Sequence, residues 1–205
     1  MKNQPADPDV ETLLKKDIFQ RVADGDWYQF SHEPEMQKIV ETSAQTVQKI
    51  NDIAKTDVKK ADQLLNDFLP HAANDVEILY PICTIEHPNC LYIEDGTFIN
   101  SNLQILSAGK VTIGKNCFIG PNCQLYTPNH HPHDKKLRRE GWQYDRPITI
   151  GDDCWFGGSV ILLPGVTLGD NVVVGAGSVV THDLPSNVVA AGNPARIIKH
   201  TDTED

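Results

Sequence analysis

The stretch IGDDCWFGGSVILLPGVTLGDNVVVGAGSVV, residues 150–180, carries an apolar residue at every sixth position. These residues are Ile150, Phe156, Leu162, Leu168, Val174 and Val180, and glycine directly follows four of them. A period of six matches neither the 3.6-residue period of a helix nor the two-residue period of a strand. It is typical of a solenoid in which short straight segments alternate with bends. The stretch therefore predicts a parallel β-helix, a mainly β fold.

The same rhythm extends upstream, with one interruption. It runs through Ile93, Ile99 and Ile105, gains two residues before Ile113, and resumes at Ile119 and Leu125. Three six-residue faces per coil would stack into a triangular prism whose inward residues form apolar columns. The residues alone do not decide the handedness of this prism.

A second inward position in each segment must be small. It holds Cys117, Cys123, Cys154, Val160, Val166, Val172 and Ser178. Three of the five cysteines are therefore expected in the core, a common place for a free thiol; Cys83 and Cys90 have no assigned role. The corners Gly114–Asn116, Gly151–Asp153 and Gly169–Asn171 contain residue types that tolerate left-handed backbone angles.

The first part of the chain has helical periodicity instead. One helix is predicted around Val10–Val22, a second from Pro34 to Ile50, and a third from Val58 to Leu69. Because short amphipathic helices bury little surface alone, we expect all three to pack on the open first coil. This divides the chain into a helical cap region, residues 1–75, and a β-helix domain, residues 76–205.

The composition limits the possible functions. The net charge is −10 and the pI about 5.2, which argues against a large nucleic-acid interface and against an anionic membrane surface. No N-terminal apolar run or long apolar segment suggests secretion or membrane spanning, so a cytoplasmic location is expected.

The repeat is interrupted from residue 126 to residue 149, which predicts a protruding loop. This loop contains Asn129-His130-His131-Pro132-His133-Asp134. Three explanations are open: a solvated histidine-rich loop, a histidine that acts as a general base near neutral pH, or a metal site. Adjacent histidines in an extended segment point to opposite sides, so a tetrahedral metal site within one chain is awkward.

Several motifs resemble the maltose and galactoside O-acetyltransferases, a subfamily of the hexapeptide-repeat acyltransferases. They are Gly25–Tyr28, Pro34–Met36, Asn129–His133, Gly141–Tyr144, Pro147–Gly151, Pro164–Gly169 and Ala190–Arg196. The resemblance covers most of the chain, densely after Asn116 and loosely before Val76. It implies a left-handed parallel β-helix that assembles as a homotrimer, with acetyl-CoA between neighbouring prisms and no required metal.

The resemblance also implies a catalytic histidine directly before a proline in the loop. His131, before Pro132, matches when the sequence is aligned without gaps back from Pro147; counting forward from Asn122 would select His130 instead. No cysteine or serine lies in the histidine segment, so direct attack by the acceptor hydroxyl on the thioester is expected.

Other residues of this chain match functional positions of the family, and each of them could also have a purely structural role. Asn100 matches an acceptor contact, or else turns a corner. Gly158 matches a backbone donor to the thioester carbonyl, and Trp155 an aromatic residue beside the site. Ala176 and Thr181 match positions along the pantetheine arm and nucleotide; for Ala176 the alternative is ordinary core packing. Arg196 and Lys199 match cations near the nucleotide phosphates, where arginine binds well.

Three departures concern the acceptor more than the donor. Leu106-Ser107-Ala108 lacks an aspartate that the family uses to bind the sugar. Glu86-His87 replaces an Asp or Ser with an aromatic neighbour, and His182 replaces a lysine near the coenzyme. We therefore expect an acetyl-CoA-dependent O-acetyltransferase whose acceptor is a sugar or related small alcohol of unspecified identity. The alternatives are a zinc enzyme similar to the γ-type carbonic anhydrases and a non-enzymatic solenoid scaffold.

Overall fold

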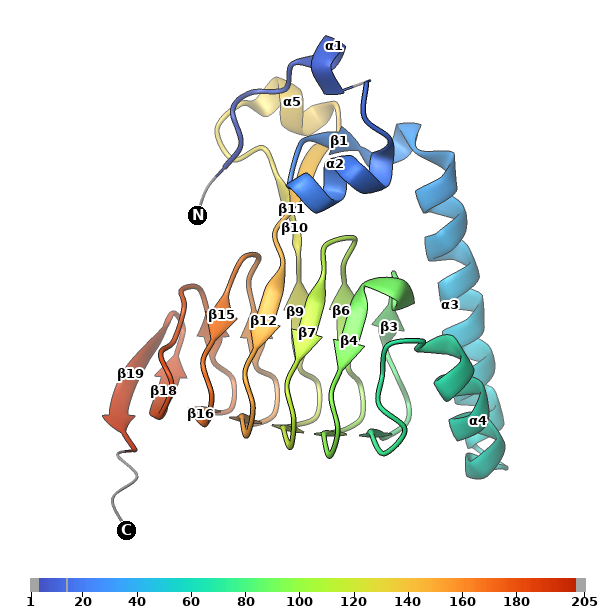
Figure 1. The fold of residues 1–205 in the computed structure, drawn as a ribbon, viewed down its shortest axis with the longest axis vertical. Coiled ribbons are helices and arrows are strands. Elements are labelled where there is room, and N and C mark those ends of the chain that lie inside the picture. Colours follow the sequence, from blue (N-terminus) through green and yellow to red (C-terminus); the bar gives the residue numbers. More distant parts are fainter. Residues whose placement is uncertain (1–3, 14, 202–205) are drawn as a thin grey trace.

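The computed structural model describes residues 4–13 and 15–201. From β2 onward the chain winds into a left-handed parallel β-helix with three faces, as predicted (Figure 1). The four-stranded face contains β4 (Leu91–Ile93), β7 (Val111–Ile113), β12 (Ile148–Ile150) and β15 (Thr167–Leu168). The five-stranded face contains β3 (Thr84–Ile85), β6 (Gln104–Leu106), β9 (Gln124–Tyr126), β14 (Ile161–Leu162) and β17 (Val179–Val180).

The seven-stranded face closes the triangle. It contains β2 (Glu77–Ile78), β5 (Phe98–Ile99), β8 (Phe118–Ile119), β13 (Trp155–Phe156), β16 (Val172–Val174), β18 (Val188–Gly192) and β19 (Ala195–His200). All neighbours on this face are parallel except β19, which returns antiparallel to β18. This final hairpin forms the end of the coil farthest from the helices (Figure 1).

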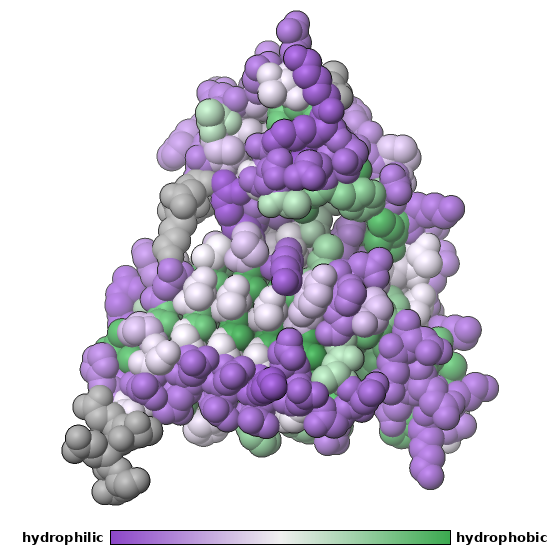
Figure 2. Space-filling model, in the orientation of Figure 1, coloured by the Kyte–Doolittle hydropathy of each residue, from purple (hydrophilic) through white to green (hydrophobic). Residues whose placement is uncertain are grey.

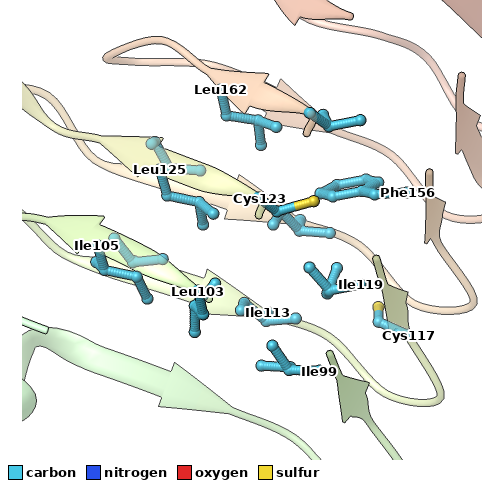
Figure 3. Close-up of a cluster of buried hydrophobic side chains, with 14 of the residues drawn as sticks. Ile99, Leu103, Ile105, Ile113, Cys117, Ile119, Cys123, Leu125, Phe156 and Leu162 are labelled. Carbon is cyan, nitrogen blue, oxygen red and sulfur yellow. The ribbon is translucent and has the colours of Figure 1, made fainter. Parts of the chain in front are cut away.

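The sixfold rhythm places equivalent residues above one another. Ile150 pairs with Leu168, and Phe156 pairs with both Ile119 and Val174. These side chains are at most 1 % exposed and belong to one continuous apolar core, of which Figure 3 shows Ile119, Phe156 and their neighbours. Cys117, Cys123 and Cys154 are fully buried in that core, which confirms their predicted position.

The predicted corners have the expected backbone angles. Asn116, Asp153 and Asn171 have φ of 54°, 56° and 54°. Gly151 is required for a second reason, because a Cβ there would lie 2.6 Å from the carbonyl carbon of Gly169 on the next coil. Glycine therefore allows the coils to stack closely.

Two of the predicted helices cover the open first coil. Helix α3 (Pro34–Ala54) starts at the predicted proline, and α4 (Val58–Phe68) packs against it. Val47, Ile50 and Leu65 join the same apolar core as Ile82 and Ile85 at the start of the coil. A short 3₁₀ helix, η2 (Pro88–Cys90), marks the corner that follows β3.

The first predicted helix behaves differently, and that prediction is wrong. It is two pieces, α1 (Val10–Leu13) and α2 (Ile18–Asp24), the second capped by the Asp17 side chain; Leu14 lies outside the described residues. Leu13 and Trp27 are buried against Trp142 of the protruding loop rather than against the first coil. We call the described part of residues 4–32, which includes β1 (Tyr28–Gln29) and η1 (Phe30–His32), the N-terminal arm.

The arm and the loop share a small sheet. Strand β1 pairs antiparallel with β11 (Trp142–Asp145), which pairs antiparallel with β10 (Pro128–His130). Helix α5 (Lys135–Arg139) lies between β10 and β11 in the loop. The loop and arm stand together above the coil in Figure 1. No helix among the described residues is long and apolar enough to cross a membrane.

Candidate active site

His131 follows directly after β10 and is buried by the N-terminal arm. Its side chain is 3 % exposed, and its ring stacks on the indole of Trp27 with centroids 5.0 Å apart. The indole Nε1 in turn donates to the carbonyl of Ala6 at 2.7 Å. Tyr144 packs edge-on against the same indole. The arm therefore forms one wall around the predicted base.

Both ring nitrogens of His131 have partners. Nδ1 accepts the backbone N–H of Asp134 at 2.8 Å. Nε2 lies 3.2 Å from Oδ1 of Asp7 and 3.4 Å from Nε2 of Gln4. Because Nδ1 accepts, we assign the proton of the neutral ring to Nε2, which donates it to the Asp7 carboxylate.

The turn after His131 is built by its own side chains. The Asp134 carboxylate caps α5 by accepting the N–H groups of Leu137 and Lys136, and these bonds hold the pKa of that carboxyl below its usual range. Arg138 Nη1 donates to the carbonyl oxygens of His131 and Pro132 at 2.9 Å and 3.2 Å. Arg138 therefore ties the backbone of His131 and Pro132 to α5.

His130 lies in a separate environment, as alternation along a strand requires. It is exposed and pairs with Gln143 in the small sheet. Together with Glu86, Tyr28 and Gln143 it lines a cavity of about 170 Å³, which we call the small cavity. The structure therefore brings two predicted residues, His130 and Glu86, to one cavity.

Glu86 follows β3 at the corner between the five- and four-stranded faces. Burial raises the pKa of its carboxyl, a backbone hydrogen bond from Ser107 opposes the shift, and the negative charge of Asp145 adds to it. A carboxyl in this environment binds a proton more readily than one in water, so it can also donate a hydrogen bond to an acceptor oxygen.

Asp145, at the end of β11, is the residue that sequence reasoning missed. It is 1 % exposed and accepts the backbone N–H groups of Ala108 and Gly109 at 3.2 Å and 3.0 Å. It also accepts the hydroxyls of Thr127 and, at 2.6 Å, Tyr28. Burial, followed by the charge of Asp145, raises the pKa of the Tyr28 phenol.

Asp145 therefore places a carboxylate beside the Ser107–Ala108 step, where the sequence has no acidic residue. It ties the arm, the loop and the coil to one another. The only sequence signal was an aspartate at the end of the loop, and nothing in the local sequence indicated its partners.

The predicted donor residues lie on another face. Trp155 is 57 % exposed on β13. On the seven-stranded face, Trp155 lies in register with Val173, Val189 and Lys199 on the next three strands. In the other direction, Phe118 and Phe98 continue the same row. This outward row, which we call the outer row, joins aromatic residues to an exposed lysine.

Gly158, Asn100 and Ala176 lie near the corner between the seven- and five-stranded faces. Gly157 N and Ser159 N each donate to a backbone carbonyl at 2.8 Å, whereas the N–H of Gly158 donates to no backbone oxygen in the described chain. Ala176 is exposed, so it is not a core residue. The Asn100 side chain accepts the N–H of Ser101 at 2.8 Å.

The remaining predicted residues lie toward the end of the coil. Thr181 and His182 follow β17, with Thr181 Oγ1 2.8 Å from Nδ1 of His182. Arg196 is exposed on β19, and its guanidinium donates to the Ala195 carbonyl at 2.8 Å. Arg196 and the outer row lie on the seven-stranded face, away from the corner that carries His131 and Glu86. Thr181 and His182 follow a strand of the five-stranded face, so they lie at that same corner, farther along the coil.

No group of three histidine, cysteine, aspartate or glutamate side chains within the described ranges is arranged to hold a metal ion. His130 and His131, the adjacent candidates for a zinc site, occupy different surroundings. The geometry within one chain therefore gives the zinc-enzyme alternative no support.

Comparisons with known proteins agree with the fold and the motifs. The family described as "Hexapeptide repeat of succinyl-transferase" matches residues 110–125 and 147–182. Galactoside O-acetyltransferase of Escherichia coli is 39 % identical over 150 residues, 73 % of this chain and 73 % of that protein. A maltose O-acetyltransferase from Clostridium difficile superposes with a TM-score of 0.85 at 34 % identity, covering 91 % of this chain and 98 % of that one.

A second solved structure, galactoside acetyltransferase in complex with coenzyme A, has a TM-score of 0.79 at 32 % identity, covering 91 % of this chain and 92 % of that one. Both solved structures cover 91 % of this chain, so the structural similarity extends well beyond the residues that the family model matches. The chain belongs to the hexapeptide-repeat acyltransferases, within the maltose and galactoside O-acetyltransferase subfamily.

Proposed function

We propose that this chain is an acetyl-CoA-dependent O-acetyltransferase that acetylates a hydroxyl of a sugar or related small alcohol, with His131 as general base. The observation that carries the proposal is the position of His131. Its ring stacks on Trp27 and its backbone carbonyl accepts a hydrogen bond from Arg138, in a loop inserted into a coil that is similar to those of acetyltransferases. A coenzyme A complex of one relative supports the donor.

The active site in this proposal lies between two chains of a homotrimer. The loop leaves the corner between the five- and four-stranded faces, whereas Trp155 and Lys199 lie on the face opposite that corner. Assembly through the outer row, whose Phe118 and Trp155 are 56 % and 57 % exposed, would cover apolar surface and bring a neighbour's loop toward the donor residues. Arg196 and Lys199 would then bind the nucleotide phosphates.

The reaction requires one proton to move twice. The acceptor oxygen attacks the thioester carbonyl carbon while its proton passes to Nε2 of His131. The N–H of Gly158, which donates to no backbone oxygen in the described chain, stabilises the tetrahedral oxyanion. The carbon–sulfur bond then breaks, and the imidazolium returns the proton to the departing thiolate of coenzyme A. The acetyl ester and free thiol are the products.

In this structure the His131 ring is not ready to act as a base. Its Nε2 carries a proton that is directed at Asp7, so it cannot accept another. We propose that the acceptor hydroxyl takes the place of Asp7, and that the Asp134 N–H turns away so that Nδ1 can carry the ring proton. In the cytoplasm, the expected location, acetyl-CoA would be the donor.

The first test compares two neighbouring histidines. With acetyl-CoA and a panel of sugars and simple alcohols, His131→Ala should lower kcat by about 10²- to 10⁴-fold, the usual contribution of a positioned base. Its affinity for acetyl-CoA, measured by calorimetry, should stay within about threefold of the parent value. His130→Ala is the matched control and should retain most of kcat. The reverse pattern would make His130 the base, and transfer to no acceptor would reject the activity.

The second test asks whether the site is shared between chains. His131→Ala and the double variant Arg196→Glu/Lys199→Glu should each be nearly inactive alone. After the two are unfolded and refolded together, mixed assemblies should regain part of the activity, because some interfaces pair an intact loop with an intact donor surface. Light scattering gives the oligomeric state. Absence of recovery in mixed trimers would place the whole site within one chain.

A further inference from the structure

The part of the N-terminal arm that precedes α1 lies over the base of the proposed reaction. Residues 4–9, which we call the strap, lead from the N-terminal end of the described chain to α1 (Figure 1). Asp7 Oδ1 lies 3.2 Å from Nε2 of His131, and the Gln4 side-chain amide lies 3.4 Å from the same nitrogen. The Ala6 carbonyl accepts a 2.7 Å hydrogen bond from Trp27, whose indole stacks on the His131 ring. The strap therefore contacts both the base and the residue that packs on it.

With the strap in place, neither ring nitrogen of His131 can accept a proton. Nδ1 already accepts the backbone N–H of Asp134, and Nε2 donates its proton to Asp7. A general base needs a free lone pair directed at the hydroxyl that it deprotonates. The acceptor hydroxyl and the Asp7 carboxylate therefore compete for one atom, Nε2. His131 is only 3 % exposed, so little of it is open to solvent while the strap is closed.

The strap is held by few contacts. Within the described chain, no backbone–backbone hydrogen bond involves residues 4–8, and Pro5 and Pro8 have no N–H to donate. The Asp7 side chain is 79 % exposed, and ion pairs at such exposed positions contribute little to stability. Figure 2 shows mainly hydrophilic residues at the top of the molecule, where the arm and loop lie. A segment with so few backbone contacts opens far more readily than the coil.

We propose that the strap is autoinhibitory: its closed form withholds Nε2 of His131 from the acceptor, and its release opens the site. The inference rests on the proposed function, because it concerns access to the base of that reaction. A closed form lowers the apparent affinity for the acceptor in proportion to the fraction of molecules that are open. Saturating acceptor keeps the strap open, so the strap raises KM and leaves kcat nearly unchanged.

The first test compares two carboxylates of the arm. Asp7→Ala removes one contact to Nε2, and Gln4→Ala/Asp7→Ala removes both. Glu11→Ala is the matched control, because it deletes a carboxylate at another exposed position of the arm.

Kinetics use acetyl-CoA and the sugar or alcohol of the panel that reacts fastest. Asp7→Ala should raise kcat/KM about 2- to 5-fold through KM, the double variant should raise it at least as much, and Glu11→Ala should leave it unchanged. An unchanged or lower kcat/KM for Asp7→Ala would overturn the inference, since its carboxylate would then not inhibit.

Chemical labelling gives a second readout that needs no turnover. Diethyl pyrocarbonate acylates a neutral imidazole that solvent can reach, and tandem mass spectrometry separates His131 from the exposed His130, which serves as the internal reference. Labelling of His131 should be slow in the parent protein, about 2- to 5-fold faster in Asp7→Ala and unchanged in Glu11→Ala. Equal rates in the parent and Asp7→Ala, or faster labelling in both variants, would overturn the inference.

The two measurements together separate this inference from the proposed function. Faster labelling of His131 in Asp7→Ala but not in Glu11→Ala, combined with no acetyl transfer to any acceptor, would support the strap as a cover of His131 and reject the activity. Acetyl transfer with equal labelling and equal kcat/KM in the parent and Asp7→Ala would reject the strap and leave the activity in place.

Discussion

The coil and the N-terminal arm are stabilised in different ways. Inside the coil, Ile113, Ile150 and Leu168 repeat one apolar contact from turn to turn. The arm and the loop combine small apolar clusters with single polar contacts, such as the four bonds to Asp145 and the 2.7 Å ion pair between buried Arg21 and Glu33. Repeated apolar burial spreads stability over many residues, whereas each polar contact in the arm has no substitute nearby. The region that holds His131 is therefore the more easily disturbed.

Phe156→Ala tests the coil and should have the largest effect. The side chain is fully buried between Ile119 and Val174, so its removal leaves a cavity and should lower the free energy of unfolding by about 3–5 kcal/mol. Urea denaturation followed by circular dichroism measures this change. Phe19→Ala, at an exposed site in the arm, is the control and should lose less than about 1 kcal/mol. Equal losses in the two variants would contradict a stability concentrated in the coil.

Asp145→Ala tests the arm and should have an intermediate effect. It leaves the buried hydroxyls of Thr127 and Tyr28 and the N–H of Ala108 without this acceptor, and should lower stability by about 2–4 kcal/mol. Hydrogen exchange should show that amides of the arm and loop lose protection while those of the coil keep it. The exposed Asp67→Ala is the control. Uniform loss of protection throughout the chain would mean that arm and coil unfold together.

The smallest effect concerns the pH dependence of stability at two neighbouring groups, Glu86 and His87. The pKa of His87 is lowered from 6.5 by burial, so below that pH the unfolded chain binds more protons and stability falls as pH falls. The pKa of Glu86 is raised from 4.5 by burial, so its contribution is complete below pH 4.5 and is lost as pH rises.

Between pH 4.5 and 7.5, the free energy of unfolding of two variants, measured by denaturation relative to the parent protein, should therefore change in opposite directions. Relative to the parent protein, His87→Phe should become more stable as pH falls below 6.5. Glu86→Gln should become relatively more stable as pH rises above 4.5. Parallel curves for both variants and the parent would show that neither group is perturbed by burial.

The core positions and the corners could be predicted from local sequence, because each residue of the repeat packs against its equivalent on the next coil. Each inward residue predicts its neighbour one coil away, so the spacing of the repeat was enough to place Cys117 and Cys154 in the core, where both are buried. Asn116 and Asn171 could be placed at corners for the same reason, since left-handed angles restrict the residue type. The loop was predicted only from the interruption of the six-residue period.

The arm could not be placed in this way. Val10–Val22 has helical periodicity, and periodicity states that one face is buried without saying against what. Trp27 packs on His131, 104 positions away, and Tyr28 bonds Asp145, 117 positions away. Sequence spacing cannot predict such contacts, because each of them joins two irregular segments that meet only in the folded chain.

By itself, the sequence determined the β-helix, its core and its corners, since all three depend on interactions that recur every few residues. It also located the histidine loop, because the recurrence stops there. The tertiary structure decided that the arm covers this loop, that Asp145 supplies a carboxylate beside Ser107–Ala108, and that His87 is buried in the lining of two adjacent cavities. Such features depend on where distant segments meet, and only the folded chain brings them together.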